Sequence, residues 1–323
     1  MTSMPGSAPS NGGPSVFSSA TQALLDSVKR AGFPPIHEQP LAQARRSYSL
    51  GVGATALPPL PMARVEDFHI PGPAGQIPAR LWAASQAPDL PVFLYLHGGG
   101  FVIGGIDTCE AMCTVLAQRS GGAVVAIDYR LAPEHKFPAG LDDSFAALQW
   151  LAEQGHTRGL DASRMAVGGD SAGGTLAAST ALMARDAGIP LVLQALFYPS
   201  VQLGMKTESL MAYSRSTLLS WDLMHWFEKQ TQGGAQRERW HREPLHAPSH
   251  TGVAPAWIGL AQCDPLTDEG HLYAARLRDA GVPVVLREWP GVIHDFINMG
   301  RFLPEAAQAH DALGEALKQV WTR

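Results

Sequence analysis

Ser171 is the residue with the clearest chemical potential, because it lies in the pentapeptide Gly169-Asp170-Ser171-Ala172-Gly173. An apolar run at 164–168 precedes the pentapeptide, and a run with helical character begins at the serine. A serine between a strand and a helix stands on a sharp turn, where a Cβ two residues before or after it would collide with the turn. The pattern indicates an exposed nucleophile, although a chain with 33 glycines can also hold such a string in a turn without chemistry.

Consecutive glycines at 98–100 form a second stretch with chemical potential. They follow His97 and an apolar run at 92–96, which predicts that they leave the end of a buried strand. Because glycine has no side chain, successive backbone N–H groups can converge on one oxygen, as a developing oxyanion requires. A phosphate-binding loop is the rival interpretation, but no Gly-Lys-Ser/Thr sequence follows the glycines. We expect the N–H of Ala172, the residue after the serine, to be a further donor.

Asp264 and His294 provide an acid and a base. Asp264 follows an apolar run and precedes a proline, and a carboxylate there can hold a histidine in one tautomer. Asp268 is a second candidate, but it is better placed to cap the next helix, with Glu269 favourable to the dipole of that helix. His294 lies on a loop after the last apolar run, and Ser, Asp, His is the chain order of the triad in α/β-hydrolases. We therefore predict a triad of Ser171, Asp264 and His294.

The composition is that of a large globular chain. Its 323 residues are 46% hydrophobic, enough for one large α/β domain with an insertion or for two domains. A net charge of −5 provides no basic surface for nucleic acid or anionic membranes. We find no secretion signal and no apolar run long enough to span a bilayer. Three scattered cysteines, Cys109, Cys113 and Cys263, indicate a reducing compartment, so a cytoplasmic location is expected.

Strand and helix patterns alternate from about residue 62 onward. The expected strands are 63–70, 77–83, 92–96, 123–127, 165–167, 191–197, 256–261 and 284–289. The expected helices are 16–28, 41–50, 141–151, 175–184, 219–230, 269–280 and 304–321. Continuous apolar strands that alternate with helices predict an α/β fold, with a mostly parallel central sheet and helices on both of its faces. Ligands bind at the carboxyl ends of such strands, where the stretches described above fall.

Segments outside this alternation differ in composition. Residues 1–15 consist mainly of Pro, Gly, Ser and Asn and are expected to form a loose terminus. Gly51-Val52-Gly53 is expected to end the second helix. We predict three parts: a tail and helical cap part at 1–55, a catalytic domain at 56–199 and 246–323, and a cap insertion at 200–245.

Five ordered motifs run through the chain. They are HGGGF (97–101), DYRLAPEHKFPA (128–139), GDSAGG (169–174), DPLTDEG (264–270) and HDFINM (294–299). Together they resemble the bacterial hormone-sensitive-lipase family, also called family IV esterases, in its GDSAG-type branch. The resemblance extends from about residue 60 to the end of the chain. It implies an α/β-hydrolase fold with a helical cap, carboxylesterase activity on short- to medium-chain acyl esters, and no cofactor. It also implies Gly99 and Gly100 as oxyanion donors and leaves the contribution of Gly98 open.

Asp295 departs from the family pattern, in which glycine commonly follows the catalytic histidine. An acid beside His294 would raise the pKa of the imidazole if it faced the ring, but we expect its side chain to point outward. The charged residues within 128–136 are expected to form ion pairs that brace the elbow. Asp142 and Asp143 are expected to serve the dipole of the helix that begins there.

Two residues are candidates for substrate binding. Asp170 either contacts the substrate or holds the elbow, and Tyr198 ends the strand at 191–197 and is expected to point toward the site. An aromatic set is expected either to line the acyl pocket or to pack within the cap: Phe17, Trp221, Trp226 and Phe227. No metal site is expected from His241, His246 and His250, because prolines between them break any common helix face.

The expectations combine into a serine carboxylesterase that acts on small-molecule esters through an acyl-enzyme. An amidase or N-deacylase with the same triad is an alternative, because the acyl chemistry is shared. A non-catalytic small-ligand receptor on the same fold is another, although such receptors lack the triad histidine. No nucleic acid partner and no stable membrane insertion are expected, and the edge strand at 284–289 suggests a homodimer.

Overall fold

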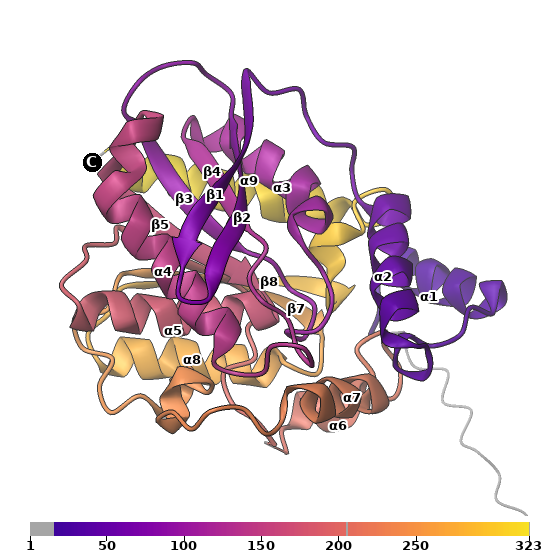
Figure 1. Cartoon of the computed structure of the whole chain (residues 1–323). Helices are drawn as coiled ribbons and strands as arrows, with labels where there is room; N and C mark the ends of the chain where they lie inside the picture. The colour runs from indigo at the N-terminus through magenta and orange to yellow at the C-terminus, as the bar shows by residue number, and fades with distance from the viewer. Residues whose placement is uncertain (1–15, 205, 323) are drawn as a thin grey trace, which may run out of the picture.

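A mixed eight-stranded sheet forms the centre of the structure (Figure 1), a computed structural model that describes residues 16–204 and 206–322. The strand order is β1-β2-β4-β3-β5-β6-β7-β8. All neighbours from β4 to β8 are parallel, whereas the pairs β1–β2 and β2–β4 are antiparallel. The strands are β1 (Arg64–Gly72), β2 (Gly75–Ala83), β3 (Leu90–Leu96), β4 (Ala123–Ile127), β5 (Leu160–Asp170), β6 (Leu193–Phe197), β7 (Ala256–Cys263) and β8 (Val284–Ile293).

Central strands β3, β4 and β6 are buried along their whole length, as their continuous apolar sequences predict. Strand β5 is longer than the predicted 165–167, because its first residues pair with β3 before an irregularity in the register. Polar residues such as Asp161 and Ser163 interrupt the apolar pattern there, so hydrophobicity alone did not detect this part of the strand.

Helices cover both faces of the sheet (Figure 1). The helices α4 (Ala139–Gln154), α5 (Ala172–Asp186) and α8 (Thr267–Asp279) pack on one face, and α3 (Ile106–Ser120) and α9 (Pro304–Trp321) pack on the other. Cys109 and Cys113 are buried on α3, and both are free thiols. Short 3-10 helices lie at Ile36–Glu38, Gly155–Arg158, Arg239–His241, Pro244–His246 and Phe296–Asn298. The predicted mostly parallel sheet with helices on both faces is confirmed.

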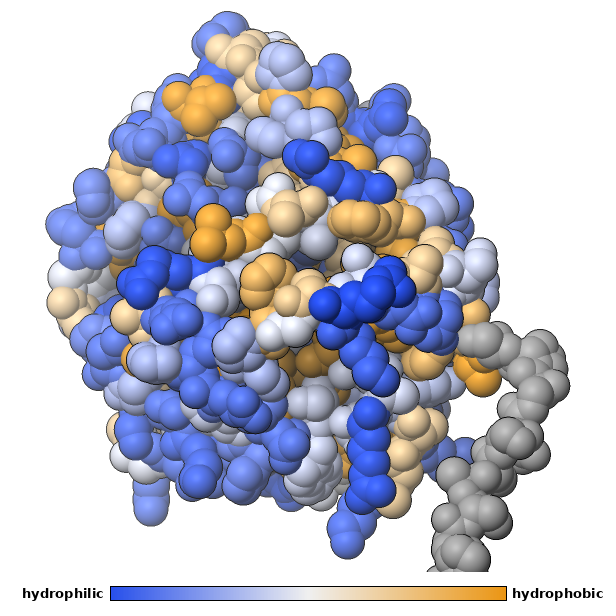
Figure 2. All heavy atoms as spheres, turned by 90° about the vertical axis from the view of Figure 1, so that its right-hand side faces the viewer, coloured by the Kyte–Doolittle hydropathy of each residue, from blue (hydrophilic) through white to orange (hydrophobic). Residues whose placement is uncertain are grey.

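Four further helices lie on one side of this core: α1 (Ser19–Ala31), α2 (Leu41–Thr55), α6 (Glu208–Tyr213) and α7 (Trp221–Thr231) (Figure 1). Tyr48 of α2 and Phe227 of α7 pack against the same small apolar cluster, which contains Val102 and Ile103. Figure 2 views the molecule from this side and shows small apolar patches interspersed with hydrophilic side chains. N-terminal residues and the 200–245 segment therefore meet over the chain that follows the HGGGF motif.

Helix α2 contradicts one expectation, because it continues through Gly51-Val52-Gly53 to Thr55. The N–H of Ala56 donates to the carbonyl of Val52 at 2.8 Å and closes the last turn. Glycine costs a helix roughly 1 kcal/mol relative to alanine, and contacts of α2 elsewhere offset this cost.

The division into a cap and a catalytic domain stays a prediction. The expected loose terminus at 1–15 lies outside the described residues. No helix within residues 16–204 and 206–322 has both the length and the apolar character needed to cross a bilayer.

Candidate active site

Ser171 occupies a sharp turn between β5 and α5. Its backbone has φ 52° and ψ −119°, outside the range that side chains ordinarily favour. A Cβ at Gly169 or at Gly173 would collide with the carbonyl oxygen of Leu96 on β3. The prediction that both flanks of the serine require glycine is therefore confirmed. The N–H of Ser171 donates to the carbonyl of Phe197 at 2.9 Å, which fixes the turn against the end of β6.

The structure brings Ser171, His294 and Asp264 together from the ends of β5, β8 and β7. His294 Nε2 lies 3.0 Å from Ser171 Oγ, and His294 Nδ1 lies 2.7 Å from Asp264 Oδ2. The second carboxylate oxygen of Asp264 accepts the N–H of Leu266 at 2.9 Å. Because a carboxylate only accepts hydrogen bonds, it holds the proton on Nδ1 and leaves Nε2 free to accept the hydroxyl proton.

Asp264 is fully buried, and the side chain of His294 is nearly so. Burial acts to lower the pKa of His294, but the charge of Asp264 and the hydrogen bond to it, together with Asp295 and Asp170, hold the pKa above its ordinary value. Tyr198 packs against the imidazole with ring centroids 4.6 Å apart. The imidazole is thus more basic than an ordinary histidine side chain, and both Asp264 and Tyr198 hold it in place.

Three backbone N–H groups, two in the HGGGF motif and one directly after Ser171, have no acceptor among the described residues: those of Gly99, Gly100 and Ala172. Gly100 has φ 60°, and a Cβ there would penetrate the ring of Phe227. Gly98 differs, because its N–H donates to Asp170 Oδ1 at 2.9 Å and is not available to a substrate. Of the three consecutive glycines, the second and third therefore retain free donors.

A family model described as "alpha/beta hydrolase fold" matches residues 93–298. The chain belongs to the α/β-hydrolase family. Esterase LipI of Mycobacterium tuberculosis is 40% identical over 269 residues, which cover 80% of this chain and 83% of the relative. Ethyl acetate hydrolase of Pseudomonas putida is 37% identical over 305 residues, 92% of this hydrolase and 96% of the relative.

Solved structures give the same result. The hyperthermophilic esterase from Pyrobaculum calidifontis superposes with a TM-score of 0.88 at 37% identity, covering 95% of this hydrolase and 99% of that chain. Like the relatives named above, the chain is a carboxylic ester hydrolase of the hormone-sensitive-lipase-like group.

Asp170 and Tyr198, the predicted substrate-binding residues of this hydrolase, are both buried. Asp170 is buried and accepts hydrogen bonds from the Tyr95 hydroxyl and the Gly98 N–H, so it ties the serine turn to the glycine loop. Burial raises the pKa of Asp170, against the hydrogen bond from Tyr95. Tyr198 has no exposed surface, and its ring supports His294. The role of these two residues in substrate binding stays a prediction. Their contacts in the structure are with Tyr95, Gly98 and His294.

Asp268 does not cap α8 as expected, because the helix begins at Thr267. Its carboxylate accepts the N–H of Ser209 at 2.9 Å, while Ser209 Oγ accepts the N–H of Asp268 at 3.2 Å. This reciprocal pair joins α6 to α8. Asp264 is the acid that contacts the imidazole.

Glu269 stands in the first turn of α8, as expected, but its carboxylate also binds another segment of the chain. It is buried, and Oε2 accepts the N–H groups of Val201 and Gln202 at 2.9 and 3.1 Å. Burial raises the pKa of Glu269 to about 8. The residue thereby anchors the chain as it leaves β6 for the 200–245 segment.

The expected outward direction of Asp295 is wrong. Its carboxylate accepts a hydrogen bond from Nδ2 of Asn298 at 2.7 Å and lies 3.4 Å from the Tyr48 hydroxyl of α2. Burial raises the pKa of Asp295 to about 7, and the charge of Asp170 acts in the same direction. The sequence could not reveal this contact, because Tyr48 is 247 positions away.

Charged residues of the 128–139 motif form ion pairs, as expected, and their partners lie on α4 and α2. Arg130 forms a two-pronged pair with Asp143, with N–O distances of 2.8 Å. Asp143 is thus an ion-pair partner rather than a dipole residue. Glu134 pairs with Arg45 of α2 at 2.7 and 2.8 Å, a contact for which the sequence contained no local signal.

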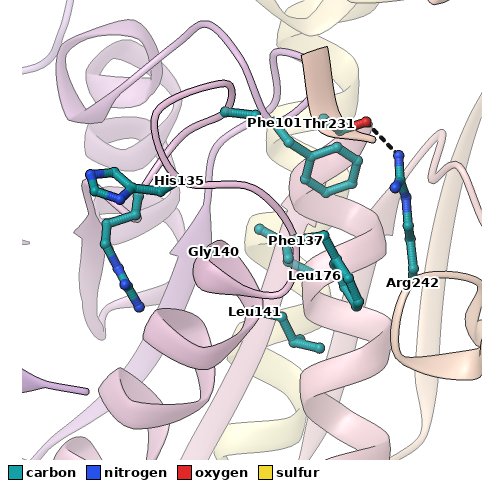
Figure 3. Close-up of a pocket in the computed structure, with 10 residues that line it drawn as sticks. Phe101, His135, Phe137, Gly140, Leu141, Leu176, Thr231 and Arg242 are labelled. Carbon is teal, nitrogen blue, oxygen red and sulfur yellow. Dashed lines mark hydrogen bonds between the residues drawn. The ribbon is translucent and has the colours of Figure 1, made fainter. Parts of the chain in front are cut away.

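A small apolar cavity of about 20 Å³ is lined in part by the charged motif at 128–139 (Figure 3). Phe101 and Leu176 line it from the HGGGF motif and α5, and Thr231 of α7 bonds Arg242 at its rim. A more open groove of about 420 Å³ adjoins it and shares Arg130 and Phe137. Neither space includes Ser171 or His294, so these spaces do not define the reactive centre.

The aromatic candidates separate in the structure. Phe227 and Trp226 pack over the cluster at Val102, whereas Trp221 is 52% exposed. No group of three His, Cys, Asp or Glu side chains with the geometry of a metal site occurs in the described parts of the chain.

Proposed function

We propose that the chain is a serine carboxylesterase that hydrolyses short- to medium-chain acyl esters through an acyl-enzyme on Ser171. The observation that carries this proposal is the unbroken hydrogen-bond chain from Asp264 through His294 to Ser171, with distances of 2.7 and 3.0 Å. These distances are within the reach that a general base needs for a hydroxyl proton.

In the first step, Ser171 Oγ attacks the ester carbonyl while His294 Nε2 takes its proton. The carbonyl oxygen becomes an oxyanion, which the N–H groups of Gly99, Gly100 and Ala172 stabilise. The tetrahedral intermediate expels the alkoxide, which receives the proton from His294 and leaves as the alcohol. Asp264 stabilises the imidazolium in the meantime without becoming protonated.

Water then attacks the acyl-enzyme, and His294 again takes the proton. Collapse of the second intermediate returns that proton to Ser171 and releases the carboxylic acid. No further group is needed to balance the reaction. A short acyl group is supported by one relative, the ethyl acetate hydrolase of Pseudomonas putida.

Replacement of Ser171 by alanine tests the proposal. We expect turnover of a p-nitrophenyl ester to fall by about 10⁶, because the nucleophile and its base act as a unit. Ser85→Ala is the control. This exposed serine lies before the first residue of β3, whereas Ser171, Asp264 and His294 follow the last residues of their strands, at the opposite edge of the sheet. An organophosphate should label wild type and Ser85→Ala but not Ser171→Ala. Near-normal turnover by Ser171→Ala would refute the triad.

A series of p-nitrophenyl esters from acetate to laurate tests the chain-length part. We expect kcat/KM to peak among the shorter acyl groups and to fall for the longest. Matched amides separate the amidase alternative, and faster cleavage of the amide would contradict an esterase.

A further inference from the structure

Arg45 of helix α2 donates hydrogen bonds to two backbone carbonyls, one of them just after the HGGGF motif. Its Nε donates to the carbonyl of Val102 at 2.9 Å, and Nη2 donates to the carbonyl of Ala132 at 3.0 Å. Val102 is fully buried, and Arg45 reaches it from a helix 57 positions earlier in the chain. The guanidinium is therefore directed into the backbone of the site.

The carbonyl of Val102 belongs to the same peptide group as the N–H of Ile103. That N–H donates to the carbonyl of Gly99 at 3.0 Å, as does the N–H of Val102. The carbonyl of Gly99 in turn shares a planar peptide group with the N–H of Gly100. Since C=O and N–H point in opposite directions in a trans peptide, holding the Gly99 oxygen fixes the direction of the Gly100 N–H.

A continuous series of hydrogen bonds thus runs from Arg45 through two peptide groups to the free N–H of Gly100. Hydrogen bonds in such a series polarise one another, and a charged donor at one end strengthens the donor at the other. The contact of Nη2 with the carbonyl of Ala132 does not extend the series, because that carbonyl shares its peptide group with Pro133, which has no N–H. It holds the guanidinium beside Val102.

We propose that Arg45 is a positioning residue that orients and polarises the Gly100 N–H as an oxyanion donor. The proposal rests on the proposed esterase function, in which Gly100 binds the oxyanion. Arg45 touches neither substrate nor Ser171 and acts through the peptide groups at 102–103 and 99–100. Glu134 pairs with the guanidinium on its solvent side.

Four variants test the proposal with p-nitrophenyl acetate as substrate. Arg45→Met keeps an apolar stem but removes the donors, and we expect kcat to fall about tenfold with KM within about twofold of wild type. A whole oxyanion donor is worth about 10² to 10³ in kcat, and this variant weakens one donor without deleting it. Arg45→Lys keeps the charge and should recover part of the loss.

Arg46→Met is the matched control, because Arg46 is the exposed neighbour of Arg45 on the same helix. Glu134→Gln keeps Arg45 beside Val102 but removes the ion pair. Both controls should retain kcat within about twofold. An organophosphate titration gives the concentration of reactive Ser171 in every preparation, so that turnover is counted per folded site.

The proposal is overturned if Arg45→Met matches Arg46→Met in kcat per titrated site, or if the whole loss falls on KM. It is also overturned if Glu134→Gln loses as much as Arg45→Met, because the ion pair would then be the relevant contact. If Arg45→Met does not fold, a kcat for Arg45→Lys equal to that of wild type overturns it as well. Failure of the esterase function itself would be visible separately, as turnover retained by Ser171→Ala.

Discussion

Replacing Asp264 by asparagine reverses the hydrogen-bond polarity at His294. In the native protein the two carboxylate oxygens accept the N–H of Leu266 at 2.9 Å and face His294 Nδ1 at 2.7 Å. An asparagine would direct its carbonyl oxygen to the Leu266 N–H, which leaves its NH₂ group facing Nδ1. The imidazole would then carry its proton on Nε2 and could not accept the proton of Ser171.

The size of the effect follows from two contributions. Turning the amide over restores the right tautomer but leaves the buried Leu266 N–H without an acceptor, which costs about 1–3 kcal/mol. Loss of the carboxylate charge beside the imidazolium removes about 4 kcal/mol, for charges about 4 Å apart at an effective dielectric constant of about 20. The sum of about 5–7 kcal/mol corresponds to a fall in turnover of roughly 10⁴ to 10⁵. We expect about 10⁴ for Asp264→Asn.

The assay is steady-state hydrolysis of a p-nitrophenyl ester by wild type, Asp264→Asn and Asp268→Asn. Asp268→Asn is the matched control, because Asp268 is the neighbouring acid and binds the N–H of Ser209 rather than the imidazole. We expect the control to retain turnover within about tenfold. A mild effect of Asp264→Asn together with a severe effect of Asp268→Asn would show that the wrong acid has been assigned to His294.

Three further predictions concern residues around the site. Asp295, with its pKa of about 7, carries its charge above about pH 7, and that charge raises the pKa of His294. Asp295→Asn removes it, so the upper part of the acid limb of kcat/KM should move to lower pH; an unchanged profile between about pH 5 and 9 would contradict this. Gly100→Ala adds a Cβ against the ring of Phe227 at φ 60°, so kcat for p-nitrophenyl acetate should fall by at least about 10²; activity near that of wild type would refute the assigned donor. Glu269 has a pKa raised to about 8, so the folded protein binds a proton at this carboxyl more tightly than the unfolded chain does. Wild type therefore loses stability as pH rises from about 5 through about 8. Glu269→Gln removes this titration, so its melting temperature should exceed that of wild type at about pH 8 by more than at about pH 5, and an equal difference at both would count against burial as the cause.

The sequence was informative where a residue's role depends on its immediate neighbours. Ser171 could be recognised because the glycines that its turn needs stand two residues away on either side. Asp264 and His294 could be placed near it because the carboxyl ends of parallel strands meet at one edge of a sheet. Strand β4 was predicted with its observed bounds, since all five of its residues are apolar and buried.

Contacts between distant segments were beyond the reach of sequence patterns. Whether Gly98 offers a free donor depends on Asp170, 72 positions later. The direction of Asp295 depends on a hydroxyl group from α2. The length of α2 was underestimated because a glycine pair ordinarily ends a helix, and its tertiary contacts do not show in its own sequence.

The place of α2 in the chain has a consequence for exchanging parts between related enzymes. The family model begins at residue 93, whereas α2 ends at Thr55, so the helix lies outside the segment by which the family is recognised. A chimaera that joined residues 93–323 to the first part of a relative would keep every signature motif after the junction. It would still depend on a foreign helix to supply an arginine at the carbonyl of Val102. Crossover points chosen from the motifs alone would therefore separate Arg45 from the loop that it contacts.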